Sequence, residues 1–205
     1  MGTNISLTDF VDFSIRNGTS RLTKLKEIKS RKDYHPGLDY WKGMRDGLEN
    51  FHKNKRNIDF LSSIVDESHP SKKVNYQQVI DRYKSFLGRK NIEWFTPSKD
   101  KWIYNNLNIT VNPELGLVIN DVPHLIKIYF KENPSQPNTL LDKRKLETIF
   151  FLMEDTLNHN YEQEINYSVL NAKTGKLITK NKSFINIREI LESDALAFNH
   201  LWENI

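Results

Sequence analysis

The stretch of sequence that decides the fold is residues 112–131, which read NPELGLVINDVPHLIKIYFK. Two apolar runs rich in β-branched residues flank Asn120-Asp121, a residue pair that favours a tight turn between strands. The stretch therefore predicts a β-hairpin whose strands cover residues 115–119 and 122–131.

The turn decides how Glu114 and Lys127 lie relative to each other. If Asn120 and Asp121 are the two central residues, Glu114 faces Lys127 directly, and both share one face of the sheet. A turn shifted by one residue makes them diagonal neighbours on that face, whereas a three-residue loop puts them on opposite faces. Lys127 lies among apolar residues, so its ammonium group must reach solvent, pair with an anion or line a cleft.

The sequence on either side of the hairpin completes an α+β pattern. Helical spacing of apolar residues predicts helices over residues 75–87, 140–157 and 187–202. Further strands are predicted over residues 102–111, 165–170 and 176–179. This order predicts a mixed β-sheet flanked by helices, built from a three-stranded meander, a crossover helix and a further hairpin.

The residues before this core are predicted to be helical. Helices are expected over residues 7–17, 19–31, 38–53 and 58–65, with breaks at Asn17-Gly18 and at a turn over residues 34–37. Gly43 and Gly47 lie four apart in the third helix, which permits close packing against another helix. We therefore divide the chain into an N-terminal helical extension or subdomain (1–67), which can pack on the sheet, and an α/β core (74–205).

Composition excludes several classes of protein. The chain has 205 residues and no Cys, which excludes disulfides, Cys-based zinc sites, thiol nucleophiles and iron–sulfur clusters. No apolar run approaches the roughly 20 residues of a membrane span, and no signal peptide is recognisable, so we expect a cytoplasmic protein without a membrane partner. Glycine-rich phosphate loops and the GxSxG motif are absent, and the six His show no metal-binding spacing.

Positive charge is concentrated in the first half of the chain. Residues 1–100 carry 19 Lys and Arg against 13 Asp and Glu, whereas residues 101–205 carry 11 against 13. The densest basic cluster comprises Arg16, Arg21, Lys24, Lys26, Lys29, Arg31 and Lys32. This basic cluster could contact the phosphates of a nucleic acid. The alternative is a solvated helix face whose inner stripe is Leu22, Leu25 and Ile28.

The element order, together with Pro113-Glu114 and Lys127, resembles the PD-(D/E)XK nuclease core of restriction endonucleases. The resemblance covers roughly residues 75–180. It implies Mg²⁺-dependent hydrolysis of phosphodiester bonds in DNA or RNA. Glu114 would be the acid of the Pro-acid motif, and Lys127 the lysine near the attacking water. Carboxylate oxygens are the ligands that Mg²⁺ prefers, and the metal activates water and stabilises charge on the phosphate.

The chain departs from the family pattern at Leu125. The family carries an acid two residues before the lysine, and leucine cannot bind a metal ion. Some members place this carboxylate on the following helix, which makes Glu147 the candidate here and Asp142 the second choice. Asp81 could be the acid that some members carry on the first helix. A degenerate relative would bind nucleic acid without cutting it.

Two functions from different classes follow from these observations. We expect a nuclease-like, nucleic-acid-binding protein, in which Glu114 and Glu147 bind Mg²⁺, Lys127 positions water, and the basic cluster contacts phosphates. The alternative is a non-catalytic interaction subunit of a larger bacterial complex, or a homo-oligomer. In that alternative the helix from Tyr40 to Phe51 and the final helix are docking surfaces, and Glu114 and Lys127 form a cross-strand ion pair of little energetic weight.

Overall fold

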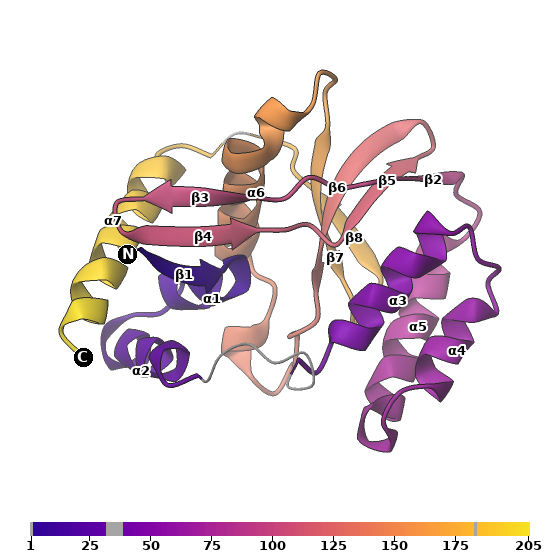
Figure 1. Cartoon of the computed structure of the whole chain (residues 1–205), viewed down its shortest axis with the longest axis horizontal. Coiled ribbons are helices and arrows are strands. Elements are labelled where there is room, and N and C mark those ends of the chain that lie inside the picture. The colour runs from indigo at the N-terminus through magenta and orange to yellow at the C-terminus, as the bar shows by residue number, and fades with distance from the viewer. Residues whose placement is uncertain (1, 32–38, 183) are drawn as a thin grey trace.

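The computed structural model of the chain describes residues 2–31, 39–182 and 184–205, and its fold is α+β (Figure 1). The strands of these residues form two sheets. A three-stranded sheet has the order β1 (Thr3–Ser6), β4 (Leu107–Val111) and β3 (Asp100–Tyr104). A five-stranded sheet has the order β2 (Ile92–Phe95), β5 (Leu115–Ile119), β6 (Val122–Tyr129), β7 (Asn166–Asn171) and β8 (Lys176–Thr179).

The hairpin that decides the fold is β5–β6, and its turn has two central residues. Ile119 pairs with Val122 in antiparallel register. The φ angles of Asn120 and Asp121 are 48° and 68°, and two consecutive left-handed residues are what the tightest hairpin turns require. The turn therefore selects the first of the three possible registers. After β6, the crossover helix α6 (Lys143–Leu157) leads to β7, which pairs with β6 in parallel, as predicted.

The strand predicted over residues 102–111 is wrong, because the chain reverses in its middle. Asn105 has a φ of 50° and lies between β3 and β4, which form an antiparallel hairpin in the three-stranded sheet. Asparagine tolerates this conformation better than other residues with a side chain. The first strand of the predicted meander is instead β2, which pairs with β5. Neither β2 nor β1 was predicted, since each has only four residues and no measurable periodicity.

The predicted helices are present with shifted ends. They are α1 (Leu7–Ser14), α2 (Gly18–Lys29), α3 (Lys42–Lys53), α4 (Phe60–Asp66), α5 (Lys73–Leu87) and α7 (Ile187–Glu203). The turn predicted over residues 34–37 lies outside the described residues. No helix in the described part of the chain is both long and apolar enough to span a bilayer.

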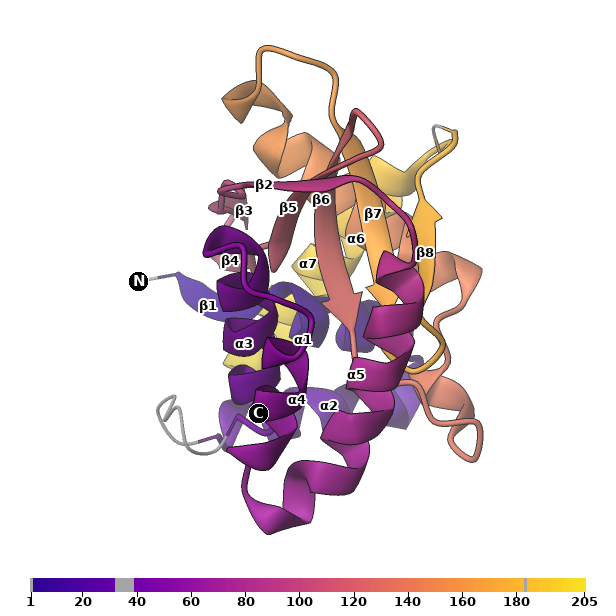
Figure 2. The same ribbon diagram turned by 90° about the vertical axis from the view of Figure 1, so that its right-hand side faces the viewer.

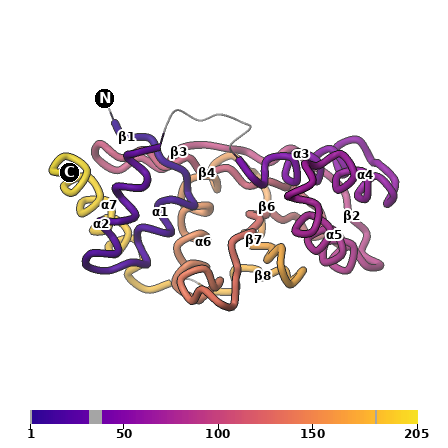
Figure 3. The backbone as a smooth tube through the Cα atoms, turned by 90° about the horizontal axis from the view of Figure 1, so that it is seen from below, coloured from indigo at the N-terminus to yellow at the C-terminus, as the bar shows by residue number. Residues whose placement is uncertain are grey.

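Strand β6 separates two hydrophobic cores, since its side chains alternate between the two faces of the sheet. Leu125 and Tyr129 belong to the first core, with α1, α6 and α7. Ile126 and Ile128 belong to the second core, with α3, α4 and α5. Figures 2 and 3 show α3–α5 on one side of β6 and the helices of the first core on the other.

The N-terminal helices contribute to both cores. Phe10 of α1 is buried in the first core, and Leu48 of α3 is buried in the second. Gly47 allows α3 to approach α4, because a Cβ atom there would lie 2.7 Å from the Ile64 side chain. The helices of residues 1–67 therefore pack on the sheet, while the division into two regions stays a prediction.

Candidate functional site

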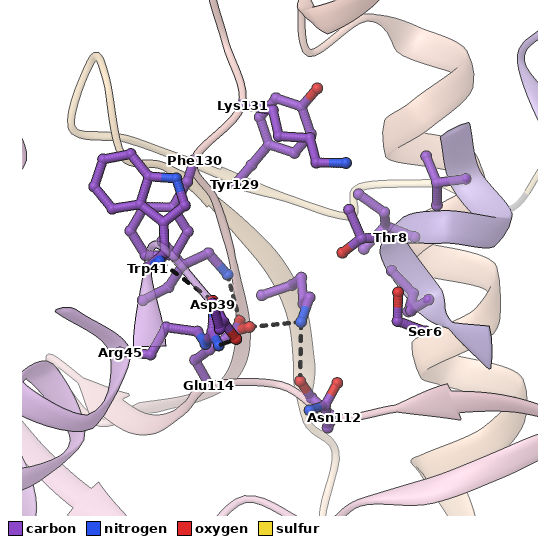
Figure 4. Close-up of a pocket in the computed structure, with 15 residues that line it drawn as sticks. Ser6, Thr8, Asp39, Trp41, Arg45, Asn112, Glu114, Tyr129, Phe130 and Lys131 are labelled. Atoms are coloured by element: carbon purple, nitrogen blue, oxygen red, sulfur yellow. Dashed lines mark hydrogen bonds and ion pairs between the residues drawn. The ribbon is translucent and has the colours of Figure 1, made fainter. Parts of the chain in front are cut away.

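The side chains of Glu114 and Lys127 meet at the open end of the β5–β6 hairpin. Figure 4 shows where Glu114 and Asn112 lie at this point. The Lys127 Nζ atom lies 2.5 Å from Glu114 Oε1 and donates a second hydrogen bond to the Asn112 carbonyl at 3.2 Å. Glu114 Oε2 accepts the backbone N–H of Ile128 at 2.7 Å. The two side chains are only 10% and 9% exposed. Both carboxylate oxygens are thus engaged, and the pair is nearly removed from solvent.

The position of the pair follows from where the chain passes between the sheets. Strand β4 ends at Val111 and β5 begins at Leu115, so only three residues connect the two sheets. Glu114 is the last of these three, and the Asn112 carbonyl lies outside the strand pairing, where it can accept from Lys127. The ion pair therefore stands at the point where the two sheets separate.

A cavity of about 410 Å³ opens beside the ion pair, and we call it the first cavity. Its lining comes from the start of α1, from the residues around the start of α3, from Asn112 and Glu114, and from the end of β6. Two further cations of its wall, Lys131 and Arg45, form ion pairs. Lys131 Nζ lies 2.5 Å from Asp12 Oδ2, and Arg45 pairs with Asp39. Each of these cations has a carboxylate partner, so an incoming anion must exchange with a carboxylate.

Trp41 forms the aromatic part of the wall. Its ring stacks on Phe130 with centroids 4.7 Å apart, and on Tyr76 at 5.5 Å. The Lys173 ammonium lies 5.5 Å from the same ring. These contacts fix Trp41 against the second core, so it serves as an anchor for α3 rather than as a platform for stacking bases.

A second cavity of about 380 Å³ adjoins the first. Both cavities are lined by Arg45, Asn112 and Glu114. The second cavity also reaches Lys99 in the loop between β2 and β3, and Glu49 on α3. Glu114 therefore lies at the boundary between the two cavities.

The carboxylates predicted to bind Mg²⁺ are not brought together. Asp142 caps α6 by accepting the Lys145 N–H at 2.9 Å, and Glu147 lies 3.6 Å from Lys143. Neither residue lines either cavity. Asp81, on α5, accepts a hydrogen bond from Gln77. Over residues 2–31, 39–182 and 184–205, no group of three or more His, Asp or Glu side chains could hold a metal ion.

Much of the charge of the basic cluster on and around α2 is neutralised inside the protein. Lys24 is buried, with its Nζ atom 3.0 Å from Glu27 and 3.2 Å from Asp9. Arg21 pairs with Asp194 at 2.7 Å, and Arg31 pairs with Asp9 at 2.8 Å.

The other members of the basic cluster differ in their surroundings. Lys29 donates to the Trp202 carbonyl at 2.8 Å, Arg16 is half-buried, and Lys26 is exposed. Lys32 lies outside the described residues. Cations of α2 thus pair with carboxylates of α1 and α7, and the helix offers few free cations to a phosphate.

Burial shifts the pKa values of Tyr129, in the wall of the first cavity, and of Lys145 on α6. Burial raises the pKa of Tyr129, and the Asp12, Glu132 and Asp142 carboxylates raise it further. Its hydroxyl donates to the Thr139 carbonyl at 2.6 Å. Tyr129 therefore stays neutral near pH 7 and holds the chain that follows β6. Burial lowers the pKa of Lys145, which donates to the Leu140 carbonyl.

Sequence reasoning missed the residues that complete the wall of the first cavity. Lys131 lies four residues after Lys127 in an extended segment, so strand alternation could have placed both on one face. No comparable signal existed for Arg45 and Asp39, because they come from α3 and from the residues before it, far away in the sequence.

The arrangement as a whole can bind an anion. Lys127 is a buried donor at a cavity wall, and its partner Glu114 is a carboxylate for which a phosphate oxygen can substitute.

No family model matches the chain, and no curated protein and no solved structure matches it.

Proposed function

We propose that the chain is a nuclease-like protein that binds nucleic acid in the first cavity, beside Glu114 and Lys127. The observation that carries the proposal is the burial of this ion pair in a cavity wall where the two sheets separate. A lysine ammonium binds phosphate as a compact point charge, and exclusion of water strengthens that attraction.

The topology supports the same proposal. Helix α5, the β2–β5–β6 meander, the crossover α6 and the parallel strand β7 follow the element order of the PD-(D/E)XK core. The β3–β4 hairpin is an addition between the first two strands of the meander. Pro113-Glu114 stands just before the second strand of the meander, and Lys127 lies in the third.

Nucleic-acid binding is the primary activity that the geometry supports. In hydrolysis, water would add to phosphorus, the bond from phosphorus to the leaving sugar oxygen would break, and that oxygen would take a proton. Lys127 could stabilise the charge on the phosphate, and Glu114 could accept a proton from water. The described residues place only Glu114 where the family binds its metal, and Leu125 is buried in the first core. These residues do not fit Mg²⁺, so the hydrolysis described here uses Lys127 and Glu114 alone.

The experiment compares binding and cleavage in one set of samples. Labelled single-stranded and duplex DNA and RNA are titrated with the protein in EDTA, in Mg²⁺ and in Mn²⁺, with anisotropy and gel analysis as readouts. The test variant is Glu114→Gln/Lys127→Gln, which removes both charges and keeps hydrogen-bonding groups. The control is Lys143→Gln, because Lys143 is exposed on α6 and lines neither cavity.

We expect the wild-type protein and the control to bind nucleic acid, and the folded double variant to lose most of that affinity. Equal binding by the double variant would place nucleic acid elsewhere on the protein and reject the proposal. Absence of binding by the wild-type protein in all conditions would reject it as well. Cleavage by the wild-type protein that is lost in the double variant would add hydrolysis to the activity.

The alternative, a non-catalytic interaction subunit, is favoured by the surface around α7. Ile190 and Leu196 of α7 are about half exposed, and Ile185 just before it is 90% exposed. The other predicted docking helix, α3, turns Met44 and Leu48 into the second core. Self-association that is lost in Leu196→Glu, with no binding of nucleic acid, would favour this alternative.

A further inference from the structure

The two cavities lie on either side of Glu114 and have three residues in common. Arg45, Asn112 and Glu114 line both. Beyond this common wall, the first cavity extends to Lys131 and the second to Lys99. Figure 4 shows Glu114 and Arg45 on one side of the first cavity, facing Ser6 and Thr8 on the other. A ligand that fills both cavities must pass over Glu114.

Lysine and arginine side chains occur along both cavities. The cations are Lys42, Arg45, Lys99, Lys127 and Lys131. Of these, Lys99 is exposed and forms no ion pair with any described residue, whereas Lys127 and Lys131 have carboxylate partners within 2.5 Å. Lys99 is therefore a cation that can contact a phosphate without first leaving a carboxylate. The basic cluster on α2 offers little of this kind, because Lys24, Arg21 and Arg31 are all paired internally.

The size of the first cavity limits what can reach the ion pair. Its volume of about 410 Å³ is at the lower end of the roughly 300–1,000 Å³ of small-molecule sites. A duplex cannot enter a cavity of this volume, because its two paired strands would have to enter together. One nucleotide of an unpaired strand presents its phosphate without the second strand beside it.

We infer that the two cavities form one groove for a single strand of nucleic acid, with one phosphate at Lys127 and a neighbouring phosphate at Lys99. The inference rests on the proposed function. It adds that the ligand is single-stranded, and it gives the path of the ligand across the protein. The strand runs from the first cavity, over Glu114, to the loop between β2 and β3. Acidic residues of the second cavity, such as Glu49, oppose its binding by charge repulsion.

The test uses three variants of the full chain and two forms of one probe. The probe is a short labelled DNA of mixed sequence, either alone or annealed to its complement. Lys99→Ala removes the exposed groove cation, and Glu49→Gln removes a groove anion. Lys176→Ala is the matched control, since Lys176 is an exposed lysine of β8 that lines neither cavity and forms no ion pair with the described residues.

We expect the wild-type protein to bind the single strand more tightly than the duplex. Lys99→Ala should weaken single-strand binding several-fold and reduce the slope of log affinity against log salt by about 0.7. Glu49→Gln should tighten binding, and Lys176→Ala should leave it unchanged.

The outcomes separate this inference from the proposed function. If the wild-type protein binds nucleic acid but Lys99→Ala binds the single strand as tightly as Lys176→Ala does, the inference of a groove is rejected and the proposed function stands. If the duplex binds as tightly as the single strand, the inference that the ligand is single-stranded is rejected. If the wild-type protein binds neither probe, both the proposed function and the groove fail.

Discussion

Leu125 and Lys127 project from the same face of β6, yet Leu125 is completely buried in the first core while Lys127 pairs with Glu114 in a cavity wall. Two positions on one strand face thus have opposite environments. The family resemblance places an acid at position 125, whereas the structure places that position among apolar side chains.

Restoring the acid by Leu125→Glu should therefore destabilise the protein instead of creating a metal site. A carboxylate buried without a partner is disfavoured by several kcal/mol, and the group takes up a proton in response. We expect a marked fall in Tm at pH 7 and no increase in Mg²⁺ affinity, measured by thermal unfolding and calorimetry. Leu125→Met, which keeps the volume, is the control. A variant with wild-type Tm and tighter Mg²⁺ binding would contradict this prediction.

Removing only one partner of the Glu114–Lys127 pair should be more damaging than removing both charges. Lys127→Ala leaves the Glu114 carboxylate buried without its cation, and breaking a buried pair in this way costs about 3–5 kcal/mol. In Glu114→Gln/Lys127→Gln no buried charge remains, so we expect a smaller loss. Urea unfolding of both variants measures the difference, and equal losses would show that the pair carries no such coupling.

His52 should make the protein less stable below neutral pH. Its Nε2 atom lies 2.6 Å from the Tyr83 hydroxyl, and burial lowers the pKa of His52 to about 4. The unfolded chain binds a proton near pH 6.5, so stability is complete above that pH and is lost as the pH falls toward 4.

The size of this effect should be about 3 kcal/mol for His52. Unfolding free energies measured between pH 7 and pH 4 test it, with His52→Gln as the variant that cannot titrate. Burial lowers the pKa of His124 too, so some slope remains in the variant. A slope unchanged by His52→Gln would assign the effect to other groups.

Gly43 and Gly47 should respond oppositely to alanine. A Cβ atom at Gly43 would lie 3.4 Å from the Tyr76 hydroxyl, which is ordinary contact, and alanine favours a helix by about 0.5–1 kcal/mol. A Cβ atom at Gly47 would lie 2.7 Å from the buried Ile64 side chain, and overpacking costs about 1–3 kcal/mol. Urea unfolding should show Gly43→Ala as stabilised and Gly47→Ala as destabilised. The same sign for both would contradict the packing.

The β5–β6 hairpin could be predicted because its determinants are local. Asn120-Asp121 and the two apolar runs predict the hairpin within 20 residues and leave three registers open, and the structure selects the one in which Glu114 meets Lys127. The same local logic failed over residues 102–111, where an apolar alternation concealed the reversal at Asn105.

The remainder of the site could not be predicted, since it depends on tertiary contacts. Arg45 lines the same cavities as Glu114 only because α3 packs on the second core, and no spacing in the sequence predicts that packing. For the basic cluster, tertiary contacts remove a feature that the sequence predicted. Its acidic partners Asp9 and Asp194 come from other helices, so a count of local charge overestimates the free cations on α2.

The pairing of β1 with β4 sets the order in which the protein can be completed. Thr3 pairs with Leu107 in parallel, so the strand that is made first joins a partner from the middle of the chain. During synthesis, residues 3–6 have no partner strand until residues 107–111 have left the ribosome, and α1, which follows β1 directly, awaits the rest of its core even longer, because that core includes Phe198 of α7. A translational pause before β4 would therefore prolong the exposure of Phe10 and Phe13 to chaperones and proteases, whereas the later β5–β6 hairpin can close as soon as it emerges.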